Sequence, residues 1–194
     1  MKYKGKIEKI KHLVVTDPTY NENVWCRYEN KNIDCENSDI TIYIDKIKTD
    51  IEDCEIETID FSLLINIGNE ECSITKNGCL KLLENTKLIK YNIGVDSACI
   101  AFGINEYANK IISSKDEWQP DCAIRTGADG LFGTVIEGKN ENGLNFIYIE
   151  GYFDSDLITT NELLNYFKEN FNIKKLTVEN EFVDKSTESM WLEV

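Results

Sequence analysis

Residues 133–153, GTVIEGKNENGLNFIYIEGYF, decide the fold of this chain. Two runs rich in β-branched and aromatic residues, Gly133 to Glu137 and Phe146 to Phe153, flank a polar stretch that ends in Asn142-Gly143. Asn-Gly readily supplies the positive φ angles of a tight reversal between antiparallel strands. The stretch therefore predicts a β-hairpin.

Two earlier segments alternate between apolar and polar residues, with the period of two that is typical of half-buried strands. In Asp39 to Asp45 the three isoleucines share one face, and in Phe61 to Ile67 the residues at odd-numbered positions do so. Leu64 lies on the opposite face of the second segment and indicates burial on both sides. Near the C-terminus, Leu176 and Val178 predict a closing strand.

One segment has clear helical periodicity, Glu162 to Phe171. Its apolar residues recur at intervals of three or four, as on one face of a helix: Leu163, Leu164, Phe167 and Phe171. Thr159 followed by Glu162 has the capping-box pattern, and Thr160 or Asn161 are alternative caps. The sequence predicts a helix that begins within a residue or two of Thr159.

These elements indicate a mainly β (α+β) fold, either an antiparallel β-sandwich or a curved sheet with one late amphipathic helix. The short apolar cluster Cys79 to Leu83 is compatible with a helical turn or with a strand. At 194 residues, with no internal repeat and no break in composition, residues 1–194 are expected to form a single domain.

The formal charge of −14 is unevenly distributed. Residues 1–11 hold five lysines and one glutamate, which leaves 16 basic and 34 acidic groups, or −18, for the remainder. Such a field repels nucleic-acid phosphates, so we expect no direct binding of nucleic acid. The same field favours a protein partner with a basic surface, although high solubility alone also explains an acidic composition.

Seven cysteines without an apolar leader fit a reducing compartment, where thiols remain free and pack as small apolar groups. No run approaches the roughly 20 apolar residues that cross a bilayer. We therefore expect a cytoplasmic protein without membrane contact. The cysteines are not paired at the spacing of a zinc site and His12 is the only histidine, so no metal or other cofactor is expected.

Motifs for catalysis are incomplete. Gly133 to Lys139 matches the first seven positions of a phosphate-binding loop, but Asn140 stands where Ser or Thr would hold magnesium, and the spacer favours a strand. Ser97 and Cys99 lack the flanking glycines of a nucleophile elbow. A hydrolase that uses two carboxylates needs no fixed spacing and stays an alternative. The pattern favours binding over catalysis.

Two loops combine rigid turn residues with chemistry-bearing side chains. The first is Thr16 to Tyr20, with its Asp17-Pro18 turn, followed by Trp25 and Cys26. The second is Arg125 to Gly130, in which one of only two arginines precedes glycines and Asp129. Arginine can clamp a carboxylate or phosphate through two parallel hydrogen bonds. The alternative is that Arg125 and Asp129 form an ion pair that holds the loop.

At these loops the chain resembles a loosely defined set of uncharacterised small proteins of bacteria and their phages. The shared pattern is Asp-Pro-x-Tyr with a following Trp-Cys, then Val-Asp-Ser-Gly, then Thr-Gly-x-Gly-Asp-Gly. This chain has Ala98 and Ala128 where that pattern has glycine. The resemblance implies an accessory protein of a phage or mobile element and supplies no catalytic residues. The matching positions are Asp17, Pro18, Tyr20, Trp25, Cys26, Val95, Asp96, Ser97, Thr126, Gly127, Asp129 and Gly130.

The sequence thus predicts a non-enzymatic acidic binding protein, an accessory protein or inhibitor that engages a host protein with a basic surface. One alternative is a pocket for a small, nucleotide-like ligand, and another is a virion or assembly component. Catalytic and metal-binding residues are not assigned. The candidate ligand-binding residues are Asp17, Tyr20, Trp25, Asp96, Ser97, Arg125 and Asp129.

Overall fold

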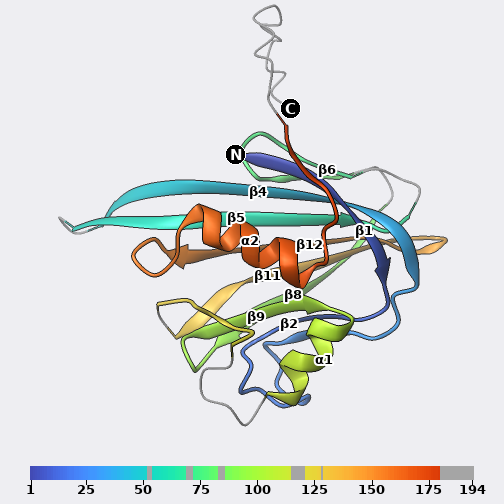
Figure 1. The fold of residues 1–194 in the computed structure, drawn as a ribbon, viewed down its shortest axis with the longest axis horizontal. Helices are drawn as coiled ribbons and strands as arrows, with labels where there is room; N and C mark the ends of the chain where they lie inside the picture. Colours follow the sequence, from blue (N-terminus) through green and yellow to red (C-terminus); the bar gives the residue numbers. More distant parts are fainter. Residues whose placement is uncertain (52–53, 69–71, 83–85, 115–120, 128, 180–194) are drawn as a thin grey trace, which may run out of the picture.

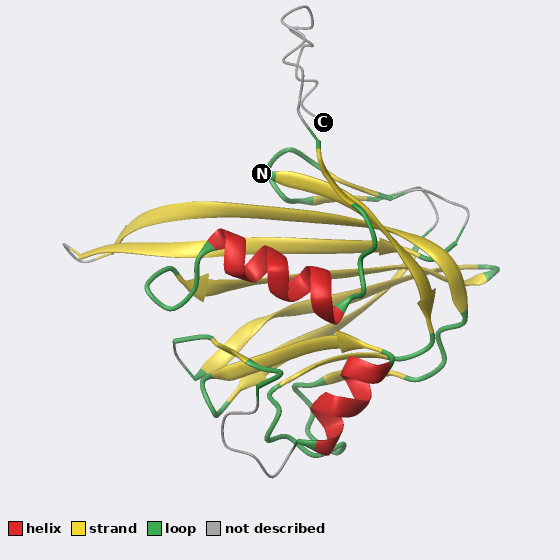
Figure 2. Cartoon of the chain, in the orientation of Figure 1, coloured by secondary structure: helices red, strands yellow, loops and turns green. Residues whose placement is uncertain are grey.

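The computed structural model describes residues 1–51, 54–68, 72–82, 86–114, 121–127 and 129–179. It is a mainly β structure made of antiparallel sheets and two helices, as the sequence predicted (Figure 2).

The largest element is a seven-stranded antiparallel sheet (Figure 1). Its strands in spatial order are β13 (Leu176–Val178), β1 (Lys2–Ile10), β4 (Cys35–Ile51), β5 (Cys54–Asn66), β12 (Gly143–Asp154), β11 (Gly130–Asn140) and β8 (Lys87–Val95). The predicted hairpin forms its β11–β12 pair, in which Asn140 lies opposite Gly143. Gly143 alone takes the positive φ of the reversal, at 112°.

A second, four-stranded sheet faces the first. Its order is β10 (Ile124–Arg125), β9 (Cys99–Ile104), β2 (Leu13–Thr16) and β3 (Tyr28–Asn30). A short hairpin, β6 (Ser73–Ile74) and β7 (Leu80–Lys81), forms a third, two-stranded sheet. The Cys79 to Leu83 cluster therefore contributes a strand, and its residue 83 lies outside the described residues.

The late helix is confirmed. α2 (Thr160–Asn170) begins after Thr159, whose side chain accepts the backbone N–H of Glu162, while the Glu162 carboxylate accepts the N–H of Thr159. The expectation of one helix was incomplete, because α1 (Glu106–Ser113) is a second. Its buried residues, Ala108 and Ile111, give it an apolar side only one turn long, which is a weak signal in a sequence.

The main core lies between the two sheets and is closed by α2. Its centre is aromatic: Phe61 of β5 packs on Phe102 of β9 and on Phe167 of α2, with ring centroids 5.6 and 5.2 Å apart. α1 covers the far side of the small sheet through Ala108 and Ile111. The layers are thus large sheet, then α2 with the small sheet, then α1.

The face of the large sheet turned away from α2 is also partly buried. Leu64, Phe146 and Tyr148 pack there against Cys72 and Ile74 of the β6–β7 segment. This confirms the expectation, drawn from Leu64, that β5 is buried on both sides. We call this face the outer face. The β6–β7 segment covers one part of it.

A buried carboxylate joins the two sheets. Glu137 of β11 is 2% exposed and accepts hydrogen bonds from the Tyr28 hydroxyl and the Asn30 amide of β3, both at 2.8 Å. Lys139 lies 2.8 Å from its other oxygen. Burial opposes ionisation of Glu137, but the hydrogen bonds from Lys139, Tyr28 and Asn30 outweigh it and lower its pKa. The segment Gly133 to Lys139 is therefore part of a strand and not a phosphate-binding loop.

Among the described residues, no helix is both long and apolar enough to span a membrane.

Candidate functional site

Asp17 joins the first predicted loop to the turn between β8 and β9. Its Oδ2 accepts the backbone N–H groups of Asp96 and Ser97, at 2.8 and 2.7 Å. Its Oδ1 accepts the Ser97 hydroxyl at 2.9 Å and both the N–H and the hydroxyl of Thr19, at 2.8 and 2.7 Å. The first of the two predicted loops therefore meets the Asp96-Ser97 turn at one carboxylate.

This carboxylate has a structural role. Asp17 is 0% exposed, so it offers no surface to a ligand. Burial alone would raise its pKa, but the hydrogen bonds from Ser97, Thr19 and Asp96 outweigh burial and hold the pKa below its ordinary value of 3.8. A carboxylate with five donors around it has no acceptor site left for a substrate.

The second predicted loop, Arg125 to Gly130, joins the same turn. Arg125 lies opposite Cys99 in the β10–β9 pair, and the N–H of Thr126 donates to the carbonyl of Ala98 at 2.8 Å. Burial first, and then the Asp17 charge, raise the pKa of the Cys99 thiol, against the influence of Arg125 and Ser97. A thiol with a raised pKa is a poor nucleophile. The structure thus brings Asp17, Ser97 and Arg125 into one region.

The remaining candidates lie around this region with different exposures. Burial, and then contacts with Cys26 and Asp96, raise the pKa of the Tyr20 hydroxyl, which places Tyr20 beside the Asp96 carboxylate. Trp25 is 79% exposed. Asp129 is exposed, as are Asp96 and Arg125. The loops converge. The fully buried Asp17 joins them through its hydrogen bonds and offers no surface to a ligand.

Ala98 has a strained backbone in this turn, with φ of 52°. A left-handed φ costs an L-residue about 1–2 kcal/mol, and glycine takes it freely. We therefore expect Ala98→Gly to raise the free energy of unfolding by about 1 kcal/mol. Urea unfolding monitored by circular dichroism would measure the change.

Ala108→Gly is the matched control for this prediction, because Ala108 lies inside α1 at ordinary helical dihedrals. The same substitution there should destabilise by about 1 kcal/mol or more. If both Ala98→Gly and Ala108→Gly lowered the free energy of unfolding, the backbone at position 98 would not be strained.

The only histidine is engaged elsewhere. His12 Nε2 lies 2.9 Å from Oε1 of Glu29, and the same carboxylate is bound by Arg27 and by Lys31, the latter at 3.0 Å. Burial opposes ionisation of Glu29, while Lys31, His12 and Arg27 together lower its pKa. His12 is thus paired with a carboxylate rather than with a serine or cysteine.

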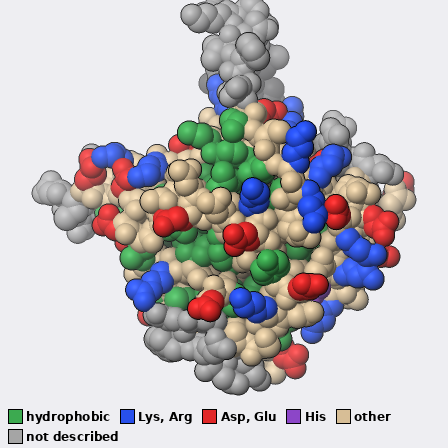
Figure 3. Space-filling view, in the orientation of Figure 1, with side chains coloured by type: hydrophobic (Ala, Val, Ile, Leu, Met, Phe, Trp, Pro, Cys, Tyr) green, Lys and Arg blue, Asp and Glu red, His purple; other side chains and the backbone are tan. Residues whose placement is uncertain are grey.

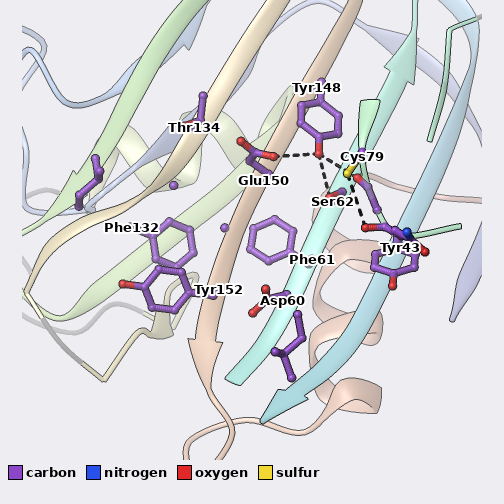
Figure 4. Close-up of a pocket in the computed structure, with 16 residues that line it drawn as sticks. Tyr43, Asp60, Phe61, Ser62, Cys79, Phe132, Thr134, Tyr148, Glu150 and Tyr152 are labelled. Atoms are coloured by element: carbon purple, nitrogen blue, oxygen red, sulfur yellow. Dashed lines mark hydrogen bonds between the residues drawn. The ribbon is translucent and has the colours of Figure 1, made fainter. Parts of the chain in front are cut away.

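A groove of about 380 Å³ lies on the outer face of the large sheet, beside the β6–β7 segment (Figure 4). One row of outer-face residues crosses the sheet through Tyr43, Ser62, Glu150 and Thr134, which are cross-strand neighbours. In the next row Asp60 of β5 lies opposite Tyr152 of β12. We call this the outer-face groove.

A hydrogen-bond network fixes one wall of the outer-face groove. The Tyr148 hydroxyl lies 3.0 Å from both the Ser62 hydroxyl and the Gly78 carbonyl, and 2.9 Å from Oε2 of Glu150 (Figure 4). Burial first, and then the Glu150 charge, raise the pKa of Tyr148, so this hydroxyl keeps its proton and acts as a donor. Its one proton is shared between two acceptors, the Gly78 carbonyl and Oε2 of Glu150, so the network positions Glu150 beside the Tyr148 hydroxyl.

The opposite wall is aromatic and apolar. The rings of Phe132 and Tyr152 stack with centroids 6.4 Å apart and planes at 21°, and they lie side by side in Figure 4. A register shift between Leu131 and Gly133 brings Phe132 to this position. The rim carries exposed apolar side chains: Leu131 (64%), Tyr152 (49%) and Ile47 (40%). Exposed apolar groups gathered around a groove are typical of binding surfaces.

The charged side chains that line the outer-face groove are both acidic, Asp60 and Glu150. Several acidic residues elsewhere on the sheet have cationic partners, such as Glu57 with Lys46 and Asp39 with Lys6. Asp45, opposite Asp60, forms no ion pair with a described Lys or Arg. Within the described part of the chain, neither Asp60 nor Glu150 forms an ion pair with a Lys or Arg. The groove therefore holds two uncompensated negative charges beside aromatic rings.

Our sequence reasoning missed this site. The signal was present in the alternation, since Tyr43, Tyr148, Glu150 and Tyr152 occupy the polar-face positions of their strands. Large aromatic residues at such positions indicate a second contact surface. What the sequence could not give is that these strands are neighbours.

The acidic charge does not cover every face. On the face that carries α2, acidic and basic side chains are interspersed, and the basic ones gather toward β1 (Figure 3). β1 carries Lys2, Lys4, Lys6 and Lys9. For a cationic partner, the relevant surface is therefore the outer-face groove, whose charged side chains are acidic, and not the face that carries α2.

Metal-binding clusters do not occur in the described residues, where no three His, Cys, Asp or Glu side chains gather as ligands. Five of the cysteines that the structure places are buried, and Cys79, at the edge of the outer-face groove, is exposed.

Comparison with family models, with curated proteins and with solved structures gives no match for this chain.

Proposed function

We propose that this protein is a non-enzymatic binding protein whose outer-face groove takes a basic segment of a protein partner. The observation that carries the proposal is the pairing of two uncompensated carboxylates, Asp60 and Glu150, with an exposed apolar rim. Opposite charge speeds association and selects the partner, while the apolar rim supplies contact area. The exposed side chains of Leu131 and Ile47 favour a macromolecule over a small solute.

The negative charge of the whole chain supports the same partner class. At −14 the protein attracts cations over a distance of about one Debye length, roughly 8–10 Å at physiological salt. Binding should therefore weaken as salt is raised.

Fluorescence anisotropy with three labelled peptides of equal length tests the proposal. One peptide alternates Arg or Lys with Leu, one replaces the basic residues by Gln, and one by Glu. We expect saturable binding of the basic peptide only. Asp60→Asn combined with Glu150→Gln should weaken it about tenfold, which corresponds to about 1.4 kcal/mol.

The matched control is Glu141→Gln combined with Glu169→Gln, which removes the same charge at two exposed positions outside the groove. It should change the affinity less than twofold. Equal weakening by both double variants would show that bulk charge alone attracts the peptide. Absence of saturable binding to the basic peptide would overturn the proposed function.

A further inference from the structure

The structure assigns a subsite for an arginine side chain of the partner, between Tyr152, Asp60 and Glu150 in the outer-face groove. This inference rests on the proposed function and names the chemical group that the groove recognises. It is carried by one aromatic ring and two oriented carboxylates that share one face of the sheet.

Tyr152 supplies the platform. Its ring is nearly parallel to that of Phe132, with planes at 21° and centroids 6.4 Å apart. Phe132 is itself 4% exposed and packs on Phe153 with ring centroids 5.1 Å apart. About half of the Tyr152 side chain remains exposed. A half-exposed ring that is anchored beside the core can receive a cation through its negatively polarised face.

The two carboxylates flank this ring. Asp60 is the direct cross-strand neighbour of Tyr152, and Glu150 precedes Tyr152 by two residues on the same face. Asp60 and Glu150 are therefore diagonal neighbours, a relation in which side chains stand about 7–8 Å apart. That spacing accommodates one planar cation between them.

Each carboxylate has one oxygen held and one oxygen open. Oδ1 of Asp60 accepts the Thr58 hydroxyl at 2.8 Å, and Oε2 of Glu150 lies 2.9 Å from the Tyr148 hydroxyl. In the part of the chain that the structure describes, the second oxygen of neither carboxylate has a hydrogen-bond partner. One oxygen of Asp60 and one of Glu150 are thus available to accept hydrogen bonds from a bound partner.

A guanidinium group matches this arrangement better than an ammonium group. It is planar, stacks on aromatic faces, and carries five N–H donors in a fixed fork that can reach two separate acceptors. An ammonium is a compact and strongly hydrated charge that gains less from the ring. The exposed Leu131 and Ile47 then contact apolar residues on either side of the arginine in the partner chain.

Nuclear magnetic resonance titration with single blocked amino acids tests the subsite without a partner sequence. The probes are N-acetyl-arginine methylamide, the corresponding lysine compound and the corresponding citrulline compound, which has the shape of arginine without its charge. We expect saturable shifts of the Gly151, Tyr152 and Ser62 amide signals with arginine, in the millimolar range. Lysine should bind at least threefold more weakly, and citrulline should give no saturation.

Tyr152→Leu and Asp60→Asn should each weaken arginine binding about tenfold or more, whereas Glu141→Gln leaves it unchanged. Both groove positions are on the surface of the sheet, and an unchanged pattern of core amide signals would establish that the variants fold. Equal affinity for arginine and lysine would overturn the arginine subsite while the proposed binding of basic segments stands. Binding of the basic peptide with no groove shift for any blocked amino acid would also overturn the subsite. Failure of the peptide itself to bind would overturn the proposed function.

Discussion

Asp17→Asn is expected to lower the free energy of unfolding by about 3–5 kcal/mol, because at least two buried donors lose their acceptor at a cost of about 1–3 kcal/mol each. Both carboxylate oxygens of Asp17 accept hydrogen bonds. An asparagine side chain must therefore turn its NH₂ group toward donors in either orientation. At the position of Oδ2, it would face the backbone N–H groups of Asp96 and Ser97.

Urea unfolding at neutral pH measures this loss, with an unchanged dependence on urea as the check that the unfolded state is the same. The control is Asp129→Asn, the same substitution at an exposed position of the converging loops. It should stay within about 0.5 kcal/mol of the wild type. If Asp17→Asn lowered the free energy of unfolding by less than about 1 kcal/mol, the conclusion that Asp17 holds the loops together would be wrong.

The same variant should change the response to acid. The folded-state pKa of Asp17 lies below its ordinary value of 3.8, so its contribution to stability is present above that pH and is lost as pH falls through the folded pKa. The stability difference between wild type and Asp17→Asn should therefore be largest near neutral pH and shrink below about pH 4. A difference that stays constant from pH 7 to pH 2.5 would show that the charge of Asp17 is not involved.

Glu137→Leu is expected to destabilise by about 3–5 kcal/mol, because it leaves the Tyr28 hydroxyl and the Asn30 amide without their acceptor between the two sheets. Glu137→Gln should cost only about 1–2 kcal/mol, since its carbonyl oxygen can still face those two donors. Lys139 is partly exposed and can turn to water. The expected order of stability is thus Glu, then Gln, then Leu.

Thermal and urea unfolding of the series measure this order. Glu141→Leu, at the exposed reversal of the same hairpin, is the control and should stay within about 0.5 kcal/mol. Because the folded-state pKa of Glu137 is lowered, its contribution is also present above the ordinary value of 4.5 and lost toward lower pH. If the Leu variant were as stable as the Gln variant, the carboxylate would not be the link between the sheets.

Five of the seven strands of the large sheet, β4, β5, β11, β12 and β13, could be predicted because their signal is local, whereas β1 and β8 were not predicted. Ile40, Ile42 and Ile44 alternate with polar residues, and burial of one side of a strand imposes that period wherever the strand lies in the sheet. The start of α2 is equally local, since the two hydrogen bonds of its capping box join residues three apart. α1 escaped prediction because its apolar side holds only two buried residues.

The loops illustrate an intermediate case. The sequence drew attention to Asp17, Ser97 and Arg125, and the structure places them in one region. Asp17 is completely buried and has five donors around its carboxylate, which indicates a structural role rather than contact with a ligand. Only the spatial arrangement distinguishes a carboxylate that binds a ligand from one that holds a loop.

By itself, the sequence determined the β-rich class, the β11–β12 hairpin and the capped late helix, because each depends on contacts between residues close in the chain. Only the tertiary structure decided the strand order, the pairing of Asp17 with a turn 80 residues away, and the outer-face groove. Tyr43, Asp60 and Tyr152 come from three strands, and nothing in their local pattern records that these strands are neighbours. The groove's charge and shape exist only once long-range hydrogen bonding between strands sets that order.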